Sequence, residues 1–145
     1  KATCFPVGAV NFTKRYIHSD PISQADFDEL VKNVYQNLPQ SFMVQDTFIG
    51  AGGGVYVCAC VASGGKIASP EEADGYEITL KELERQINLY IQTTIKQRKQ
   101  IPGMESERAD IMLAAVLIYW TLLKASGKEK FIVSTRGIRH GLVII

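Results

Sequence analysis

The pattern of apolar and polar positions predicts that the chain opens with a strand and an amphipathic helix. Apolar residues alternate along 5–13 as in a β-strand, and their phase shifts across Gly8-Ala9, which indicates a bulge. Ser23 is a typical helix N-cap residue, and the apolar positions in 27–38 recur with a period of about 3.6 residues until Pro39 ends the pattern. We therefore expect a bulged strand followed by a helix.

The middle of the chain predicts a second strand, a glycine-rich turn and another helix. Residues 44–49 are strand-like and lead into four glycines within 50–54. The apolar stretch 55–62 predicts a helix that Ser63-Gly64-Gly65 ends. Residues 69–72 predict a loop.

The second half predicts two further helices and a closing strand. A capping box at 79–82 opens an amphipathic helix whose last turn ends in the cations of 96–99. Ser106 is the expected cap of a helix over 107–124, which is apolar almost all round and therefore typical of a helix between two layers. A buried strand over 131–134 follows. The expected order of elements is β, α, β, α, α, α, β.

Composition narrows the class of protein. The chain of 145 residues fits a single domain over 1–145, and its net charge of +1 excludes a whole-molecule field that would recruit nucleic acid or an anionic membrane. The longest apolar run, 111–123, falls short of the roughly 20 residues that span a bilayer. Cys4, Cys58 and Cys60 lack the paired spacing of a zinc site and predict a reducing, cytoplasmic compartment.

The glycines give the clearest chemical signal. Gly50, Gly52, Gly53 and Gly54, with Ala51, lie between a strand and a helix N-terminus, where backbone N–H groups are able to hold a phosphate. They match neither the dinucleotide fingerprint nor the Walker loop. A tight turn without a ligand is the alternative interpretation.

Three arginines add to this signal. Arg136 and Arg139 lie beside a glycine after the last strand and predict a fork toward phosphate oxygens. In the alternative, one of them pairs with a carboxylate such as Glu107 or Asp110 and holds the loop. Arg108 lies near the N-terminus of a predicted helix, where a cation is unfavourable, so we expect it to have a specific anionic partner.

Five segments, in this order, are similar to the motifs of one family. Residues 5–13 resemble its LPLGAVRLTE strand, and 49–54 resemble its G-T-G-G-T or G-A-S-G-T loop. Residues 75–83 resemble H-G-Y-x-L-T-x-x-x-L, while 102–110 and 134–142 resemble P-G-L-x-x-x-R-A-D and S-x-x-G-L-R-E-G. In these segments the chain resembles the second domain of the Ppx/GppA family of exopolyphosphatases and guanosine pentaphosphate phosphohydrolases.

The resemblance implies an α/β fold, namely an RNase H-like domain of the actin-like ATPase fold with a mixed sheet flanked by helices. It also implies that the first strand and an N-terminal domain are missing, and the start at Lys1 instead of Met agrees with a missing natural start. Catalytic residues and the ligands of Mg²⁺ are expected in that missing part, so none is expected in this chain. A homodimer is also implied.

The implied activity is Mg²⁺-dependent release of orthophosphate from inorganic polyphosphate or guanosine pentaphosphate. Here the loops of 50–54 and 136–139 would bind phosphate or nucleotide, and the chain alone would be inactive. Around these loops, supporting roles are expected of Glu107, Arg108, Asp110 and His140.

Three residues depart from the family pattern: Gly54 replaces Thr, His140 replaces Glu and Asp74 replaces His. The first change removes a hydroxyl able to donate to phosphate, and the second replaces a carboxylate with a titratable ring. A non-catalytic sensor of an alarmone or polyphosphate, a purely structural module and a kinase-like relative remain alternatives.

Overall fold

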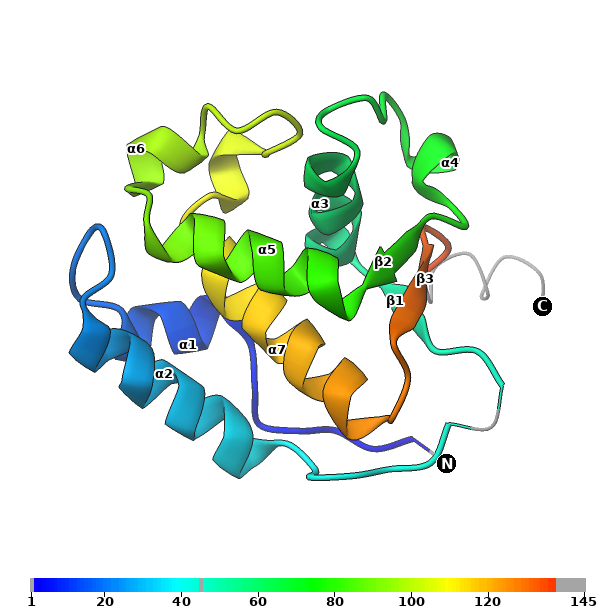
Figure 1. Ribbon diagram of the computed structural model, residues 1–145, viewed down its shortest axis with the longest axis horizontal. Helices are drawn as coiled ribbons and strands as arrows, with labels where there is room; N and C mark the ends of the chain where they lie inside the picture. The colour runs from blue at the N-terminus through cyan, green and yellow to red at the C-terminus, as the bar shows by residue number, and fades with distance from the viewer. Residues whose placement is uncertain (1, 45, 138–145) are drawn as a thin grey trace.

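A three-stranded mixed sheet lies at one end of a helical body in the computed structural model, which describes residues 2–44 and 46–137 (Figure 1). The strands are β1 (Ile49–Ala51), β2 (Glu77–Thr79) and β3 (Lys130–Ser134), in the spatial order β1-β3-β2. β1 runs parallel to the central strand β3, and β2 runs antiparallel to it. The expected α/β class with a small mixed sheet is confirmed.

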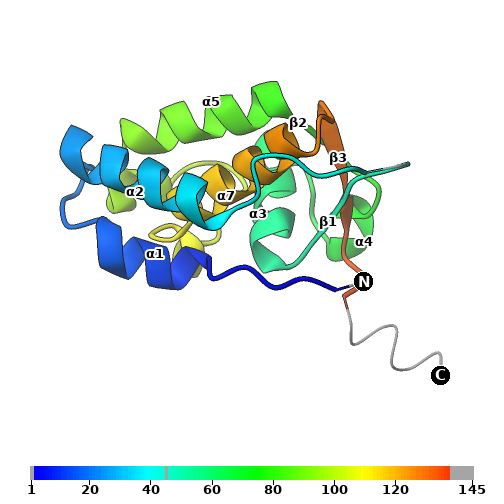
Figure 2. The same ribbon diagram turned by 90° about the horizontal axis from the view of Figure 1, so that it is seen from below.

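Helix α7 (Met112–Ala125) lies in the middle of the helical body, with α5 (Leu80–Ile91) on one side and α1 (Ala9–Tyr16) and α2 (Gln24–Asn37) on the other (Figures 1 and 2). Helix α3 (Gly53–Ala62) packs on α7 and on the sheet. The remaining elements are α4 (Pro70–Ala73), α6 (Ile95–Arg98) and the 3₁₀ turn η1 (Ser106–Arg108).

The core forms around α7, whose residues 112–118 are all buried. Leu30 and Val34 of α2 and Leu83 and Tyr90 of α5 belong to the same buried cluster. A helix surrounded in this way has no polar face to present to water, so its sequence is apolar almost all round. The prediction of a helix between layers is confirmed.

Local capping signals placed the starts of two helices correctly. At the start of α2, the Ser23 hydroxyl accepts a hydrogen bond from the N–H of Asp26 (3.1 Å). At the start of α5, the Thr79 hydroxyl accepts one from the N–H of Glu82 (3.1 Å). Each cap satisfies an N–H group that has no partner within the helix, so the helix begins where the sequence predicts.

The predicted strand over 5–13 is wrong, because α1 occupies most of that stretch. Phe12 is buried, and its ring packs edge-on against the ring of Tyr16 one helical turn later, with 5.2 Å between the centroids. Val10, which an alternating strand would bury with Phe12, is 48% exposed. The contact between residues four apart favours a helix over the alternation that the sequence suggested.

The helix predicted from 79 to 99 is two helices, α5 and α6. Thr94 and Gln97 form a second capping box, in which each side chain accepts a hydrogen bond from the other residue's N–H. The N–H of Ile95 also donates to Asp20 Oδ1 (2.8 Å) from the loop before α2. These hydrogen bonds satisfy N–H groups at the start of α6. They therefore favour two separate helices over one continuous helix.

Shorter elements also differ from the prediction. Residues 69–72, expected as a loop, contribute the cap and most of α4 (Pro70–Ala73), and β1 begins only at Ile49. Ser106 opens η1 and not the long helix, because α7 begins at Met112. β2 was not predicted. Elements of three or four residues are too short to show a periodic pattern.

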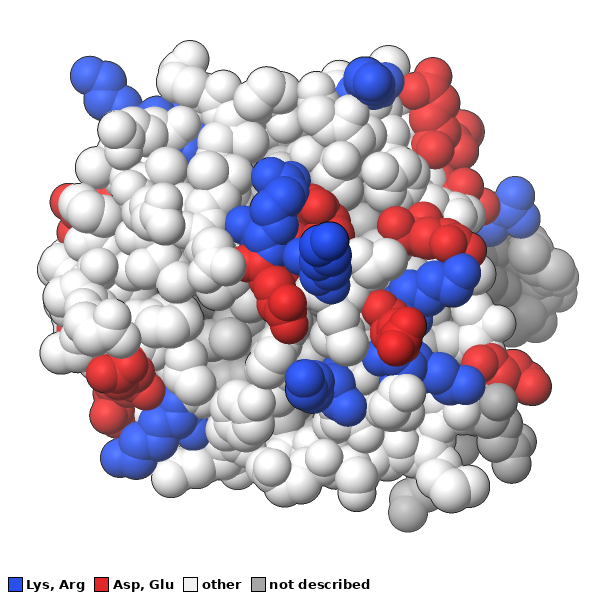
Figure 3. Space-filling model, viewed as in Figure 1, with Lys and Arg blue, Asp and Glu red and all other residues white. Residues whose placement is uncertain are grey.

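Charges of both signs are interspersed on the face shown in Figure 3, as the net charge of +1 suggests. No single-sign patch dominates this face. None of the helices within the described ranges is long and apolar enough to cross a membrane.

Arg98 is a buried arginine that joins three parts of the chain, with 2% of its surface exposed. Its Nη2 donates to the carbonyl oxygens of Tyr90 (2.8 Å) and Thr93 (3.2 Å) at the end of α5. Its Nη1 donates to the carbonyl oxygen of Ala109 (3.2 Å), next to η1. The sequence placed Arg98 at a helix end, but not inside the core.

We expect Arg98→Ala to lower the free energy of unfolding by about 3 to 5 kcal/mol, because buried carbonyl groups lose their donor. Arg85→Ala is the control, since Arg85 forms an exposed pair with Glu82 (2.7 Å) and its loss should cost under about 1 kcal/mol. Urea unfolding measures both values. Equal losses would contradict the role of Arg98.

Asp26 makes the stability of the folded chain depend on pH. Its carboxylate accepts from the N–H of His18 (2.8 Å) and the Ser19 hydroxyl (3.2 Å), and the bond from His18 contributes most to holding the pKa of Asp26 below its ordinary 3.8. Because folding lowers this pKa, the stabilisation is present above pH 3.8 and is lost as the pH falls through the folded-state value.

Asp26→Asn is therefore expected to lower the free energy of unfolding at neutral pH, with a difference from the unaltered protein that shrinks below pH 3.8. Asp28→Asn makes the same change of charge on the same helix and serves as the control. Urea titrations at a series of pH values measure the difference. A difference that stays constant into acid would refute this linkage.

Candidate phosphate-binding site

The two loops singled out in the sequence lie at the same edge of the sheet. β1 leads into Gly52 and α3, and β3 leads into residues 135–137. Since Ala51 pairs with Ser134 in the parallel register, both loops leave the carboxyl ends of neighbouring strands. In α/β sheets this is the edge where ligands bind. We call the first turn of α3 with Arg108 and Arg136 the candidate site.

The structure explains why glycine occupies each of positions 50, 52, 53 and 54, where β1 leads into α3. Gly52 has φ +123° and ψ 167°, a conformation open essentially only to glycine. A Cβ at Gly50 would lie 2.9 Å from ring carbons of Phe131. A Cβ at Gly53 would overlap the Arg108 guanidinium, and one at Gly54 would overlap the Tyr119 hydroxyl. The tight-turn interpretation therefore accounts for Gly52, but close packing accounts for the others.

The first turn of α3 presents backbone N–H groups without a side-chain cap. The N–H of Tyr56 donates to the carbonyl oxygen of Gly52 (3.0 Å), so the N–H groups of Gly53, Gly54 and Val55 precede the first bond within the helix. Gly52 and Gly53 are exposed. Uncapped N–H groups and the positive end of the helix dipole together attract an anion.

Arg108 lies directly beside this turn. Its Nε pairs with Glu105 Oε2 (3.0 Å), which confirms the expected anionic partner, and its side chain is 40% exposed. The outer guanidinium nitrogens face Gly53. A cation beside a helix N-terminus is unfavourable, and the Glu105 carboxylate offsets part of this charge.

Arg136 pairs with a carboxylate that the sequence did not suggest. Its Nε lies 3.9 Å from Asp74 Oδ2, and the Arg136 side chain is 78% exposed. Asp74 Oδ1 also accepts from the N–H of Thr135 (3.0 Å), so Asp74 anchors the loop after β3. The alternative partners Glu107 and Asp110 are exposed, and neither forms an ion pair within the described part of the chain.

The remaining predictions concern residues 139 and 140, metal ligands and the cysteines. Arg139 and His140 lie outside the described residues. Within 2–44 and 46–137, no group of three or more His, Cys, Asp or Glu side chains could hold a metal ion.

Cys58 donates to Gln86 Oε1 (3.5 Å), and burial raises the pKa of its thiol well above the ordinary value, so it remains an unreactive core residue.

Tyr119 is the residue that the sequence analysis missed. It projects from α7 toward Gly54, and its ring packs edge-on against Phe131, with 6.5 Å between the centroids. Burial raises the pKa of Tyr119 to about 12, so its hydroxyl keeps its proton at neutral pH. A tyrosine at the end of the apolar run 112–119 was the available signal, because a largely buried phenol needs a polar neighbour.

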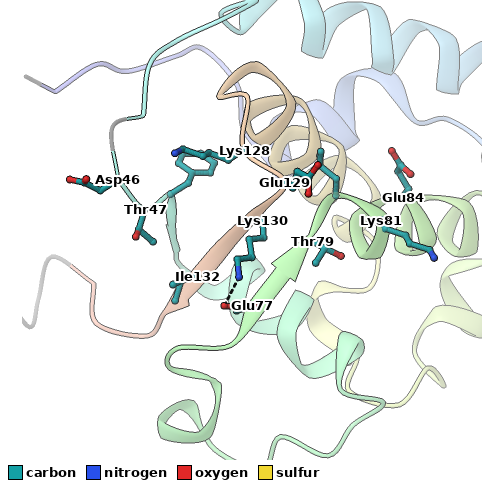
Figure 4. Close-up of a pocket in the computed structure, with 12 residues that line it drawn as sticks. Asp46, Thr47, Glu77, Thr79, Lys81, Glu84, Lys128, Glu129, Lys130 and Ile132 are labelled. Atoms are coloured by element: carbon teal, nitrogen blue, oxygen red, sulfur yellow. Dashed lines mark hydrogen bonds and ion pairs between the residues drawn. The ribbon is translucent and has the colours of Figure 1, made fainter.

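A large hollow lies elsewhere, at the amino ends of β1 and β3 (Figure 4). Its volume is about 1040 Å³, and lysines alternate with carboxylates along it, including the pair of Lys130 Nζ and Glu77 Oε1 (2.7 Å). In the same sheet, Ile49 is 60% exposed. Sheets with parallel strands are usually covered on both faces. Three lysines and four carboxylates line the hollow, so neither sign of charge prevails in it.

Known structures share this fold. The crystal structure of the Aquifex aeolicus member of the Ppx/GppA family has a TM-score of 0.83 at 23% identity, over 96% of this chain and 46% of that one. The type II variant of the A. aeolicus Ppx/GppA phosphatase gives 0.82 at 25% identity, over 96% and 47%. An exopolyphosphatase from Cytophaga hutchinsonii gives 0.77 at 20% identity, over 97% and 47%.

The chain thus spans slightly less than half the length of these solved relatives. Ppx/GppA structures have an actin-like ATPase fold, so the expected fold is confirmed. A comparison with curated proteins gives no significant match. The sequence profile of the Ppx/GppA phosphatase family matches residues 1–144, and the chain therefore belongs to the Ppx/GppA phosphatase family.

Proposed function

We propose that this chain is the second domain of a Mg²⁺-dependent hydrolase that releases orthophosphate from inorganic polyphosphate or guanosine pentaphosphate. In this proposal the chain supplies the loops that hold phosphate or nucleotide. An N-terminal domain supplies the catalytic carboxylate and the ligands of Mg²⁺, and the active protein is a cytoplasmic homodimer. Membership of the family and a length of about half that of its solved relatives support this division.

The observation that supports the proposal most is the position of Arg108 over the first turn of α3. The guanidinium lies beside the exposed Gly53, next to N–H groups that have no partner within the helix, and Glu105 offsets part of its charge. A phosphoryl group offers several acceptor oxygens and a negative charge, so it would bind both kinds of donor. Arg136, exposed at the neighbouring loop, would extend the site toward the next phosphate.

The chain's own groups would bind and orient the phosphate chain. N–H groups and guanidinium nitrogens would stabilise negative charge on the phosphoryl oxygens, and their fixed positions would align the anhydride with an attacking water. Bound Mg²⁺ would neutralise part of the phosphate charge. Backbone donors recognise the anhydride that both substrates share, so this site by itself would not distinguish polyphosphate from guanosine pentaphosphate.

We expect the full-length protein, with Mg²⁺, to release orthophosphate from polyphosphate or from guanosine pentaphosphate. A phosphate-release assay measures both, and the chain alone serves as the inactive control. Binding by calorimetry without any release would favour a sensor, the alternative that the loss of a hydroxyl at Gly54 suggests. If a folded protein showed no binding and no release, the proposal would be refuted.

Gly53→Ala tests the site itself. The added methyl group overlaps the flexible end of the Arg108 side chain, which can swing away, so the fold should persist while the cation leaves the site. We expect the dissociation constant for tripolyphosphate to rise about tenfold, because a charge-assisted contact is lost. Gly8→Ala is the matched control, since no atom lies within 4 Å of a Cβ there. Unchanged affinity in Gly53→Ala would argue against the site.

A further inference from the structure

A hollow lined by aromatic side chains lies where α2 and α5 flank α7 (Figure 1). Its volume is about 330 Å³, and Phe27 and Tyr35 of α2 and Trp120 of α7 line it. The rings of Tyr35 and Trp120 have 6.5 Å between their centroids and are inclined at 60° to each other. Ile87 and Leu117 add apolar surface. We call this hollow the aromatic groove.

A carboxylate lies beside these rings. Glu84 of α5 lines the aromatic groove, and its Oε1 accepts a hydrogen bond from the indole N–H of Trp120 (3.1 Å). This bond holds the carboxylate next to the ring. Within the described part of the chain, Glu84 forms no ion pair. The aromatic groove therefore carries a negative charge that lacks a matching cation.

The chain itself already places one cation on Trp120. The Nζ of Lys124, one turn further along α7, lies 5.4 Å from the centroid of the indole ring. At this distance the negative face of the ring attracts an ammonium group. Lys124 does not line the aromatic groove, so it leaves the groove side of the ring uncovered. A second cation is thus able to contact the same indole from the groove.

The lining determines which class of ligand fits. An anion would face Glu84 and the negative faces of the rings, and a neutral apolar ligand would bury the carboxylate without a partner. A primary ammonium brings three N–H donors, for which apolar walls offer few acceptors. A quaternary ammonium has no N–H group, so its methyl groups are able to contact the rings while its charge lies near Glu84. The volume lies at the lower end of the range for small-molecule sites.

We propose that the aromatic groove binds a small quaternary ammonium ion, with its methyl groups against Phe27, Tyr35 and Trp120 and its charge beside Glu84. This site lies on α2, α5 and α7, and it shares no residue with the candidate phosphate-binding site. It goes beyond the proposed function, and its test does not depend on phosphate binding.

Calorimetry with choline on the full-length protein tests the site. We expect a dissociation constant on the order of 1 mM. The uncharged carbon isostere of choline, in which a tert-butyl group replaces the trimethylammonium group, has the same shape without the charge. It should bind at least about tenfold more weakly, because it gains neither the attraction of the ring faces nor that of the carboxylate.

Variants locate the bound cation. Glu84→Gln keeps an oxygen that accepts from Trp120 but removes the charge, and we expect the dissociation constant for choline to rise about threefold to fivefold. Tyr35→Leu keeps an apolar side chain but removes a ring face, and should have an effect of about the same size. Lys124→Met removes a neighbouring like charge and should lower the dissociation constant. Glu71→Gln on α4 is the matched control and should leave it unchanged.

Equal affinity for choline and its isostere would make the aromatic groove a site for apolar ligands and would overturn the proposal. A folded, unaltered protein that fails to bind choline would overturn it as well. Unchanged affinity in Tyr35→Leu would place choline elsewhere, because Glu84 also lines the large hollow, which Tyr35 does not border. Should Tyr35→Leu lower Tm, Glu84→Gln decides, since it removes a charge and keeps the size of the side chain.

Discussion

The candidate site depends on how closely α7 and η1 approach the first turn of α3. Side chains at positions 50 and 54 would hold the elements apart, because they would collide with Phe131 and Tyr119, and one at position 53 would displace the end of Arg108. With glycine at all three positions, the sheet, the buried helix and the 3₁₀ turn meet around one set of N–H groups. The same absence of side chains that permits this packing also leaves the N–H groups open to a ligand.

The elements with local signals were predictable from the sequence. Ser23 and Thr79 cap their helices as expected, and the apolar stretch of α7 indicated its central place. The first helix was mistaken for a strand because one buried position, Phe12, is too little to define a period. The break between α5 and α6 was missed because the apolar pattern continues across it, although Thr94 and Gln97 formed a readable capping box.

The candidate site was predictable in its glycines but not in its neighbours. A run of glycine after a strand is visible in any sequence, whereas contacts between residues far apart in the chain depend on packing. Asp74 anchors the loop after β3, and Tyr119 reaches Gly54 from another helix. No local pattern relates such pairs. The glycines therefore indicated the candidate site, while the side chains beside them could be identified only from the tertiary structure.

The buried hydrogen bonds of Arg98 have a further consequence for Arg108. Arg98 ties the carbonyl group of Ala109, the residue after Arg108, to the end of α5. The backbone that bears Arg108 is thus already ordered in the folded chain. A bound anion would have to immobilise only the end of this side chain, so little conformational entropy would be lost when the cation engages it. Preorganised charge of this kind stabilises a ligand without the reorganisation that water would need.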